Sequence, residues 1–261
     1  MSGGRQMSQD TSDEHPYRVR QSTLVTPVIR ALELTPTDTV VTYAPGQYVL
    51  CNDAELRLPP RSYSVANAPR PDGSISLLVT RVPGGETSTW VHDRLRVGEP
   101  VLLTGPYGTF VPDPDRSGPV LLLAAGSGLA PLRALAQSLL VARPRRAVTL
   151  FVSARTGADS IDHAHFQELA RAQPSFRYLR TLTRVPVAPE RPHIPDRLGD
   201  AFASLGGWEV FTAGPPGFVT ACARAAQAQG ADPAAVHTEE FFVEPQPWVG
   251  RPPVLVEPGR R

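Results

Sequence analysis

A cation, an aromatic ring and two hydroxyls occur within four consecutive residues, Arg61-Ser62-Tyr63-Ser64. A planar guanidinium can bond two phosphate oxygens at once, and a tyrosine ring can stack on a flat heterocycle. Because side chains alternate along a strand, Arg61 and Tyr63 would share one face. The stretch is therefore a candidate site for a ligand with a phosphate and a ring. The competing interpretation is an ordinary Arg and Tyr at the rim of a half-buried sheet.

Three glycine-bearing turns are further candidate sites. The run Gly-Gly-Glu-Thr-Ser at 84–88 precedes a predicted helix over 89–95, with Thr87 or Ser88 as its N-cap. Gly-Ser-Gly at 126–128 and Ala-Gly-Pro-Pro-Gly at 213–217 each follow an apolar run and precede a predicted helix. Free N–H groups and the helix dipole favour a phosphate at such places. Each signal is weak alone: the turn at 126–128 lacks the third glycine of the dinucleotide fingerprint.

Two sequence patterns divide the chain into the elements that must position these turns. Over residues 17–113, short β-rich segments alternate with turn residues, which is typical of an antiparallel barrel or sandwich. Over residues 118–242, continuous apolar runs at 120–124 and 148–152 alternate with helical patterns at 130–142 and 165–172. That alternation predicts a doubly wound parallel sheet. Both later glycine turns would lie at the carboxyl ends of its strands, where such sheets bind ligands.

Composition limits the function classes. The chain has 261 residues, 41% hydrophobic and 20% charged, as in a globular protein large enough for two domains. No apolar run approaches the roughly 18 residues of a membrane span. Residues 1–16 read as a disordered polar leader rather than a secretory signal, and residues 243–261 as a Pro-rich tail. A cytoplasmic location is the default expectation. A net charge of +1 without a basic stripe gives no support for nucleic acid as a partner.

Cysteine and histidine spacing gives no metal centre. Cys51 and Cys222 are far apart, whereas a thiolate-bound iron–sulfur cluster needs four cysteines, so no cluster is expected. His163 and His165 stand beside Asp162 at a predicted helix start, where a solvated helix face explains them better than a metal site. The chain has no lysine, which excludes a mechanism that needs a catalytic lysine.

Four motifs, taken in order, resemble the ferredoxin–NAD(P) reductase superfamily: Arg61-Ser62-Tyr63-Ser64, Gly85-x-x-Ser88, the run from Gly126 to Pro131, and Ala213-Gly214-Pro215-Pro216. The resemblance spans roughly residues 17–242 and is closer to the FAD-containing reductase components of bacterial ring-hydroxylating oxygenases, here without the iron–sulfur domain. It implies an antiparallel, FAD-binding β-barrel (17–113) followed by an α/β doubly wound, NAD(P)-binding domain (118–242).

The resemblance also implies roles for residues of the barrel. Arg61 would bind the flavin phosphate, Tyr63 would lie against the ring or ribityl chain, and Ser64 would hydrogen-bond near flavin N5. The residues that match the pyrophosphate-binding turn are Gly84, Gly85, Thr87 and Ser88. Val79 and Arg81 match positions that meet the adenine half of FAD in relatives, which favours FAD over FMN.

In the nucleotide domain, the resemblance implies two binding segments and an acidic end. The nucleotide pyrophosphate would lie at the segment that contains Gly126, Ser127, Gly128 and Pro131. The nicotinamide would lie at the segment that contains Ala213, Gly214 and Pro215. Glu240 and Phe241 resemble the family's acidic–aromatic end near the flavin, so Ser64 and Glu240 are the expected catalytic residues. Many relatives carry Cys where this chain has Ala213, a departure that removes a thiol from beside the reacting carbons.

The choice between NADH and NADPH depends on the end of the second strand of the nucleotide domain. Arg155 and Arg184 could bind the 2′-phosphate of NADPH. An Arg-Thr pair such as Arg155-Thr156 also occurs in NADH-using relatives, and the carboxylate of Asp159 lies close by. The balance favours NADH.

The resemblance predicts an enzyme that passes electrons from NAD(P)H through bound FAD to a separate redox protein, such as a ferredoxin or an oxygenase component. Hydride would pass from nicotinamide to flavin, with the protein supplying alignment and electrostatics. Two alternatives are a reductase that uses free flavin as its substrate, and a flavin-binding regulator or non-redox catalyst without nicotinamide turnover. Because one fold can host several functions, the site itself must decide.

Overall fold

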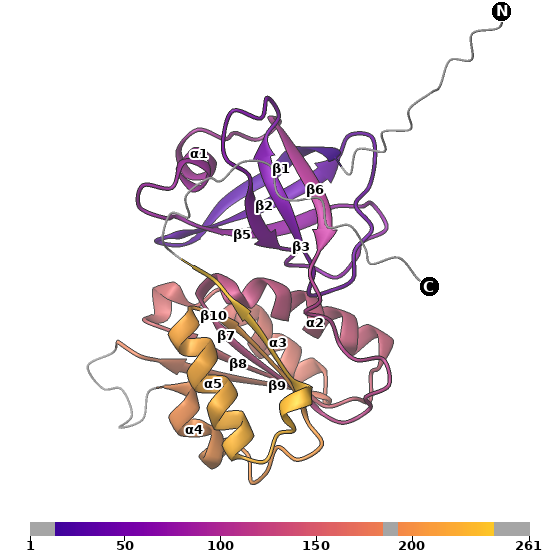
Figure 1. The fold of residues 1–261 in the computed structure, drawn as a ribbon, viewed down its shortest axis with the longest axis vertical. Helices are drawn as coiled ribbons and strands as arrows, with labels where there is room; N and C mark the ends of the chain where they lie inside the picture. Colours follow the sequence, from indigo (N-terminus) through magenta and orange to yellow (C-terminus); the bar gives the residue numbers. More distant parts are fainter. Residues whose placement is uncertain (1–13, 185–192, 243–261) are drawn as a thin grey trace, which may run out of the picture.

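The structure is a computed structural model that describes residues 14–184 and 193–242. Within these ranges the strands form two sheets, one in each of two domains (Figure 1). The first strand begins at Glu14, so the predicted leader is wrong for its last three residues, which pair with the sixth strand. Residues 1–13 of that leader and the predicted tail at 243–261 lie outside the described residues.

The N-terminal sheet is antiparallel and forms a barrel. Its strand order is β4-β3-β6-β1-β2-β5, with β1 (Glu14–Thr26), β2 (Ile29–Pro36), β3 (Tyr48–Asp53), β4 (Arg61–Ser64), β5 (Ile75–Thr80) and β6 (Pro100–Tyr107). A bridge between Val65 and Leu77 joins the two ends of this order and closes the barrel. Its interior is apolar, with Tyr17, Leu32 and Leu77 fully buried. The predicted antiparallel barrel is confirmed.

The C-terminal sheet is parallel and doubly wound, as predicted. Its order is β11-β10-β7-β8-β9, with β7 (Val120–Ala125), β8 (Val148–Ala154), β9 (Phe176–Leu182), β10 (Glu209–Gly214) and β11 (Val236–Glu240). One face carries α2 (Leu129–Ala142) and α3 (His163–Ala172), and the other carries α4 (Ile194–Ala201) and α5 (Pro216–Ala228). Because helices cover both faces, β7 is apolar along its length. The strand order reverses between β7 and β10, where such sheets bind ligands.

The two domains share a layer of packing. The apolar cluster between α2 and the sheet continues into the barrel through Ile29, Ala66 and Leu78. Phe110, in the linker after β6, packs edge-to-face on Phe211 of β10 with 5.2 Å between ring centroids. The barrel is therefore fixed against α2 and the sheet by side-chain packing as well as by the linker.

The helix of the barrel, α1 (Glu86–Asp93), begins earlier than predicted. Its N-cap is Gly85, so the prediction of Thr87 or Ser88 is wrong. Both hydroxyls have other partners: Thr87 donates to the Pro59 carbonyl, and Ser88 Oγ accepts from the Val82 N–H at 3.1 Å. The start of α1 therefore has no side-chain cap.

The two cysteines lie in different cores, Cys51 in the barrel and Cys222 on the buried side of α5. Burial raises the pKa of each thiol to about 12, so both stay protonated. Along residues 14–184 and 193–242, no three His, Cys, Asp or Glu side chains converge as a metal-binding group. Over the same ranges, no helix combines the length and the hydropathy needed to cross a bilayer.

Candidate functional site

The end of β4 meets the end of β11 at the seam between the domains. There Ser64 Oγ donates a hydrogen bond to Glu239 Oε1 at 2.7 Å, and Ser64 is only 4% exposed. Glu240, which was predicted to be catalytic, is exposed, because side chains alternate along β11 and its neighbour Glu239 is the one that meets Ser64. Sequence reasoning did not single out Glu239, since only the pairing of β11 with β10 sets which of the two carboxyl groups faces the barrel.

Glu239 is an unusual carboxyl group. Burial raises its pKa to about 7, and the hydrogen bond from Ser64 opposes this shift only in part. Its second oxygen, Oε2, is buried and lacks a hydrogen-bond partner in the described part of the chain. An unpaired buried oxygen is costly, so the site fits a ligand that supplies a donor there. Near neutral pH this carboxyl group can hold or release a proton.

The turn after β7 is a short 3-10 helix, Gly126–Gly128, that leads into α2 without a side-chain cap. Gly126 has a φ of +58°, and a Cβ added there would meet no atom within 4 Å. Gly128 is enclosed instead: an added Cβ would lie 2.2 Å from the carbonyl oxygen of Ala213 on β10. The turn therefore offers uncapped N–H groups and open space, which a phosphate requires.

Neighbouring residues hold this turn in place. Thr80 Oγ1, at the end of β5, donates to Ser127 Oγ at 2.7 Å and so ties the turn to the barrel. Pro131 is buried in the first turn of α2. Thr80 was not among the predicted residues, and its contact, 47 positions along the chain, leaves no local signal in the sequence.

The end of β10 lies beside the same turn. Ala213 is fully buried, and Gly214 has a φ of +151° with an added Cβ 3.0 Å from the Ala125 carbonyl oxygen. Pro215 is the N-cap of α5. The half-buried Phe241 follows β11 and donates its N–H to the Gly214 carbonyl at 2.8 Å. The structure therefore brings the predicted segments at 126–131 and 213–215 together at one edge of the sheet.

The barrel carries the second group of predicted residues. Gly84 has a φ of +73°, and the hydroxyl of Ser88 closes the turn onto Val82. The contact from Thr87 to the Pro59 carbonyl brings the uncapped start of α1 next to the segment that leads into Arg61. Burial raises the pKa of Tyr63, so its hydroxyl stays neutral. A guanidinium, free amides and a neutral phenol are a donor set that fits a flavin nucleotide.

Two predicted FAD contacts are placed differently. The side chain of Val79 is fully buried in the barrel core, and its carbonyl lies 3.0 Å from His92 Nε2. Arg81 extends from the end of β5 and pairs with Asp93 of α1. Only Arg81 therefore keeps a side chain within reach of a ligand outside the barrel.

The edge beyond β8 carries the residues predicted to choose the nucleotide. Asp159 accepts hydrogen bonds from Arg155 at 2.8 Å and from the hydroxyl of Thr156 at 2.8 Å. Burial opposes ionisation of Asp159, but the bonds from Thr156 and Arg155 outweigh it and lower its pKa. The backbone N–H of Arg184 donates to the Arg155 carbonyl at 2.8 Å, so the two arginines lie side by side.

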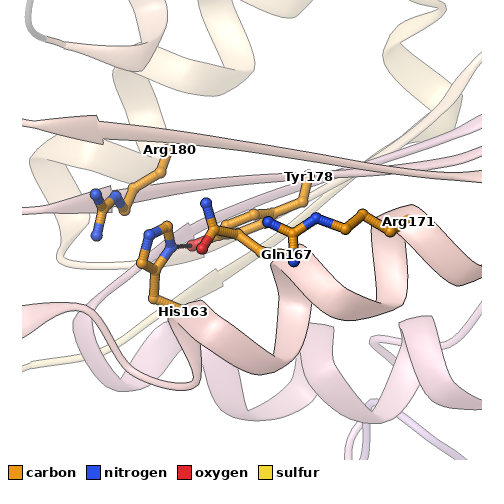
Figure 2. A pocket seen from close by; sticks show the side chains of 5 residues that line it. All are labelled: His163, Gln167, Arg171, Tyr178 and Arg180. Carbon is orange, nitrogen blue, oxygen red and sulfur yellow. Dashed lines mark hydrogen bonds between the residues drawn. The ribbon is translucent and has the colours of Figure 1, made fainter.

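A cavity of about 360 Å³ lies between α3 and β9 (Figure 2). It is lined by His163, Gln167, Arg171, Tyr178 and Arg180. His163 Nδ1 lies 3.2 Å from the Tyr178 hydroxyl. Asp162, its neighbour in the sequence, forms an ion pair with Arg133. His163 and Asp162 therefore each have a protein partner.

Comparisons with known proteins match both domains. Residues 17–111 match the family described as an oxidoreductase FAD-binding domain, and residues 122–224 match an oxidoreductase NAD-binding domain. The chain is 38% identical to the reductase subunit of an aromatic O-demethylase from Amycolatopsis sp., and 33% identical to the reductase component of a phenol 2-monooxygenase from Pseudomonas sp.. Those alignments cover 75% and 79% of this chain, but the chain spans only 60% and 61% of those relatives.

Solved structures agree with the sequence relatives. A cytochrome P450 reductase from Amycolatopsis superposes with a TM-score of 0.78 at 32% identity, covering 87% of this chain and 69% of that one. A ferredoxin reductase of carbazole 1,9a-dioxygenase superposes with a TM-score of 0.77 at 26% identity, covering 88% and 69%. Given the barrel, the doubly wound sheet and the site between them, the chain belongs to the ferredoxin–NAD(P) reductase superfamily.

Proposed function

We propose that this protein is an NAD(P)H-dependent flavoprotein reductase that binds FAD on its barrel and delivers electrons to a separate redox protein. The observation that carries the proposal is the hydrogen bond between Ser64 and Glu239, 2.7 Å long, at the domain seam. It joins the strand that carries the phosphate-and-ring donor set to the edge of the sheet that carries the open glycine turn. Flavin and nicotinamide must approach each other at such a junction.

Bound FAD would supply the redox chemistry that side chains lack, which is to accept two electrons together and release them singly. The chain's own residues bind, orient and shield. Arg61 and the uncapped amides at the start of α1 would hold the phosphates, and Tyr63 would lie against the ring system. On the other domain, the open turn at Gly126 would admit the nucleotide pyrophosphate close to the backbone.

Glu239 would bind and release a proton at the seam between the domains. With a pKa of about 7, it exists in both protonation states near neutral pH. Its unpaired Oε2 can accept a hydrogen bond from a ligand or, when protonated, donate one. Ser64 fixes the orientation of the carboxyl group through Oε1. Ala213 leaves only a methyl group on the neighbouring strand, where many relatives have a thiol.

We propose a protein as the electron acceptor. The relatives are named as reductase subunits or components of demethylase, monooxygenase and dioxygenase systems. Cys51 and Cys222 lie buried in separate cores, whereas a thiolate-bound cluster needs four cysteines together. A ferredoxin or an oxygenase component is therefore the expected next carrier. The cytoplasmic location stays a prediction.

NADH is the nucleotide that we favour. Asp159 pairs with Arg155 and thereby neutralises a cation that could bind a 2′-phosphate, while its own charge would repel that phosphate. We expect Asp159→Asn to raise the kcat/KM ratio of NADPH over NADH about tenfold, which corresponds to about 1.4 kcal/mol. Steady-state kinetics with both nucleotides measure this ratio, and Asp115→Asn, on an exposed loop, is the control. An unchanged ratio in Asp159→Asn would contradict the role.

The test of the function is an absorption spectrum of the purified protein, followed by anaerobic addition of NADH or, separately, NADPH. We expect a flavin band that bleaches with a nucleotide and recovers when an oxidised ferredoxin or cytochrome is added. A yellow protein that neither nucleotide bleaches would favour flavin binding without turnover. A colourless protein in which added FAD restores NAD(P)H oxidation would favour a reductase of free flavin.

A further inference from the structure

One arginine connects the flavin-binding strand to the nucleotide edge. Arg133, in the second turn of α2, donates from Nε to the Ala66 carbonyl and from Nη1 to Asp162 Oδ2, each at 2.6 Å. Its side chain is only 13% exposed. Ala66 belongs to the barrel, two residues after Ser64, whereas Asp162 belongs to the nucleotide domain. A single guanidinium therefore bridges three segments of the chain.

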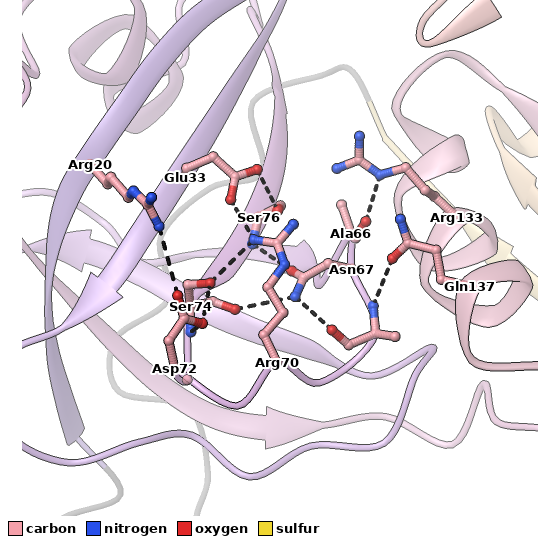
Figure 3. Close-up of polar contacts among 12 residues, drawn as sticks. Arg20, Glu33, Ala66, Asn67, Arg70, Asp72, Ser74, Ser76, Arg133 and Gln137 are labelled. Atoms are coloured by element: carbon pink, nitrogen blue, oxygen red, sulfur yellow. Dashed lines mark hydrogen bonds and ion pairs between the residues drawn. The ribbon is translucent and has the colours of Figure 1, made fainter. Parts of the chain in front are cut away.

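The barrel end of this bridge lies in a network of hydrogen bonds (Figure 3). The Ala66 N–H donates to the Ser76 carbonyl at 2.8 Å. The next side chain, Asn67, is 1% exposed and bonds to both sides of the loop, including the Ser76 N–H at 2.6 Å. Gln137, one turn further along α2, accepts from the Ala68 N–H at 3.0 Å. The segment directly after the flavin-binding strand is thus attached to α2 at two points.

The other end of the bridge fixes the nucleotide edge. Asp162 is the residue before α3 and has a φ of +52°, a left-handed conformation that is uncommon for a non-glycine residue. It closes the segment that begins with the Arg155–Asp159 ion pair. By holding the Asp162 carboxylate, Arg133 stabilises this conformation and with it the position of the edge proposed to bind the adenosine end of the nucleotide.

We infer that Arg133 is a positioning residue that sets the distance between flavin and nicotinamide by fixing β4 to the nucleotide edge. The inference rests on the proposed function. A planar guanidinium carries its donors in a fixed fork, so Nε and Nη1 of Arg133 bond two acceptors on different segments at once. Reaction rates between bound groups are sensitive to displacements on the order of 1 Å. Loss of the bridge should therefore slow the reaction more than it weakens binding.

The experiment is anaerobic stopped-flow reduction of the holoenzyme by NADH or NADPH, with Arg133→Gln, Arg133→Lys and the control Arg145→Gln, an exposed arginine in the loop after α2. For Arg133→Gln we expect about a tenfold fall in the limiting rate of flavin bleaching, with the nucleotide Kd within about threefold of wild type and the FAD content unchanged. Arg133→Lys, which can reach only one acceptor, should recover part of the rate. Arg145→Gln should behave as wild type.

A second readout does not depend on activity. Hydrogen exchange in the purified protein should be faster in Arg133→Gln over the peptides 65–69 and 156–163, and unchanged in Arg145→Gln. If Arg133→Gln does not fold, Arg133→Lys and Asp162→Asn carry the test, each with an expected threefold slower limiting rate. Wild-type protein that neither nucleotide reduces would overturn the proposed function and this role with it. A normal wild type with an equally fast Arg133→Gln variant, or a variant changed only in nucleotide Kd, would overturn the positioning role alone.

Discussion

The glycine turn that precedes α1 in the barrel and the one that precedes α2 in the nucleotide domain are closed in different ways. Both lead into a helix without a side-chain cap, at Gly85 in the barrel and at Gly128 in the nucleotide domain. In the barrel, a side chain closes the turn, because Ser88 Oγ holds the Val82 N–H. In the nucleotide domain, the backbone of β10 closes it, at a distance that leaves no room for a methyl group on Gly128. Loss of the Ser88 hydroxyl should therefore weaken the barrel turn without a steric clash. Any side chain on Gly128 should instead collide with the backbone of β10.

The largest effect should come from Gly128→Ala. Its new Cβ would lie 2.2 Å from a backbone carbonyl oxygen, so β10 or α2 must move. We expect a loss of about 3 kcal/mol in the free energy of unfolding, measured by urea denaturation. Gly157→Ala is the control, because Gly157, like Gly128 with its φ of −59°, lies outside the left-handed region, but no atom lies within 4 Å of its added Cβ. Equal losses in both variants would contradict the role of the contact between Gly128 and β10.

Gly126→Ala should separate binding from stability. The backbone strain of a φ of +58° costs about 1 kcal/mol of unfolding free energy. The methyl group would occupy the open space proposed for the nucleotide phosphates, so KM for NADH should rise about tenfold, by about 1.4 kcal/mol. Gly207→Ala, with a φ of +77° and equally open surroundings at the opposite edge of the sheet, should lose similar stability but keep its KM. A KM within twofold of wild type in Gly126→Ala would place the nucleotide elsewhere.

Ser88→Ala should act only on the barrel turn. Removal of its hydroxyl leaves the Val82 N–H without this partner, which costs about 1 kcal/mol. We expect about a fivefold rise in the Kd for FAD, measured by flavin fluorescence, and an unchanged KM for NADH. Ser62→Ala, at an exposed position of β4, is the matched control. A change in the KM for NADH without a change in the Kd for FAD would contradict the assignment of FAD to the barrel turn and of the nucleotide to the turn at 126–128.

Glu239→Gln should change how the stability of the protein depends on pH. Burial raises the pKa of Glu239 in the folded protein, so this carboxyl group stays protonated up to a pH of about 7. In the unfolded chain it loses its proton near pH 4.5. The stability that this proton contributes is complete below 4.5 and is lost as pH rises toward 7. The variant should therefore lose less stability than wild type over that window in thermal unfolding. The stability of Glu240→Gln, at an exposed position, should depend on pH as the wild type does. If Glu239→Gln lost stability with rising pH as steeply as wild type, the raised pKa of Glu239 would be contradicted.

Local patterns were sufficient for the fold. The alternating segments of the barrel and the fully apolar β7 each follow from which faces are buried, and burial imprints a period on the sequence itself. The start of α1 was not predictable in this way. Thr87 and Ser88 are good N-cap residues by type, but the Pro59 carbonyl and the Val82 N–H compete for their hydroxyls, and neither partner is marked in the sequence.

The sequence by itself determined the two domains, their order, the glycine turns and the Arg61–Ser64 strand, because each depends on residue type and short-range spacing. Only the tertiary structure decided that Glu239 rather than Glu240 meets Ser64, that Val79 belongs to the core, and that Arg133 bridges the domains. Those outcomes depend on strand register and on contacts between residues 29 to 175 positions apart. Such contacts are set by how whole elements pack, so they leave no local pattern in the chain.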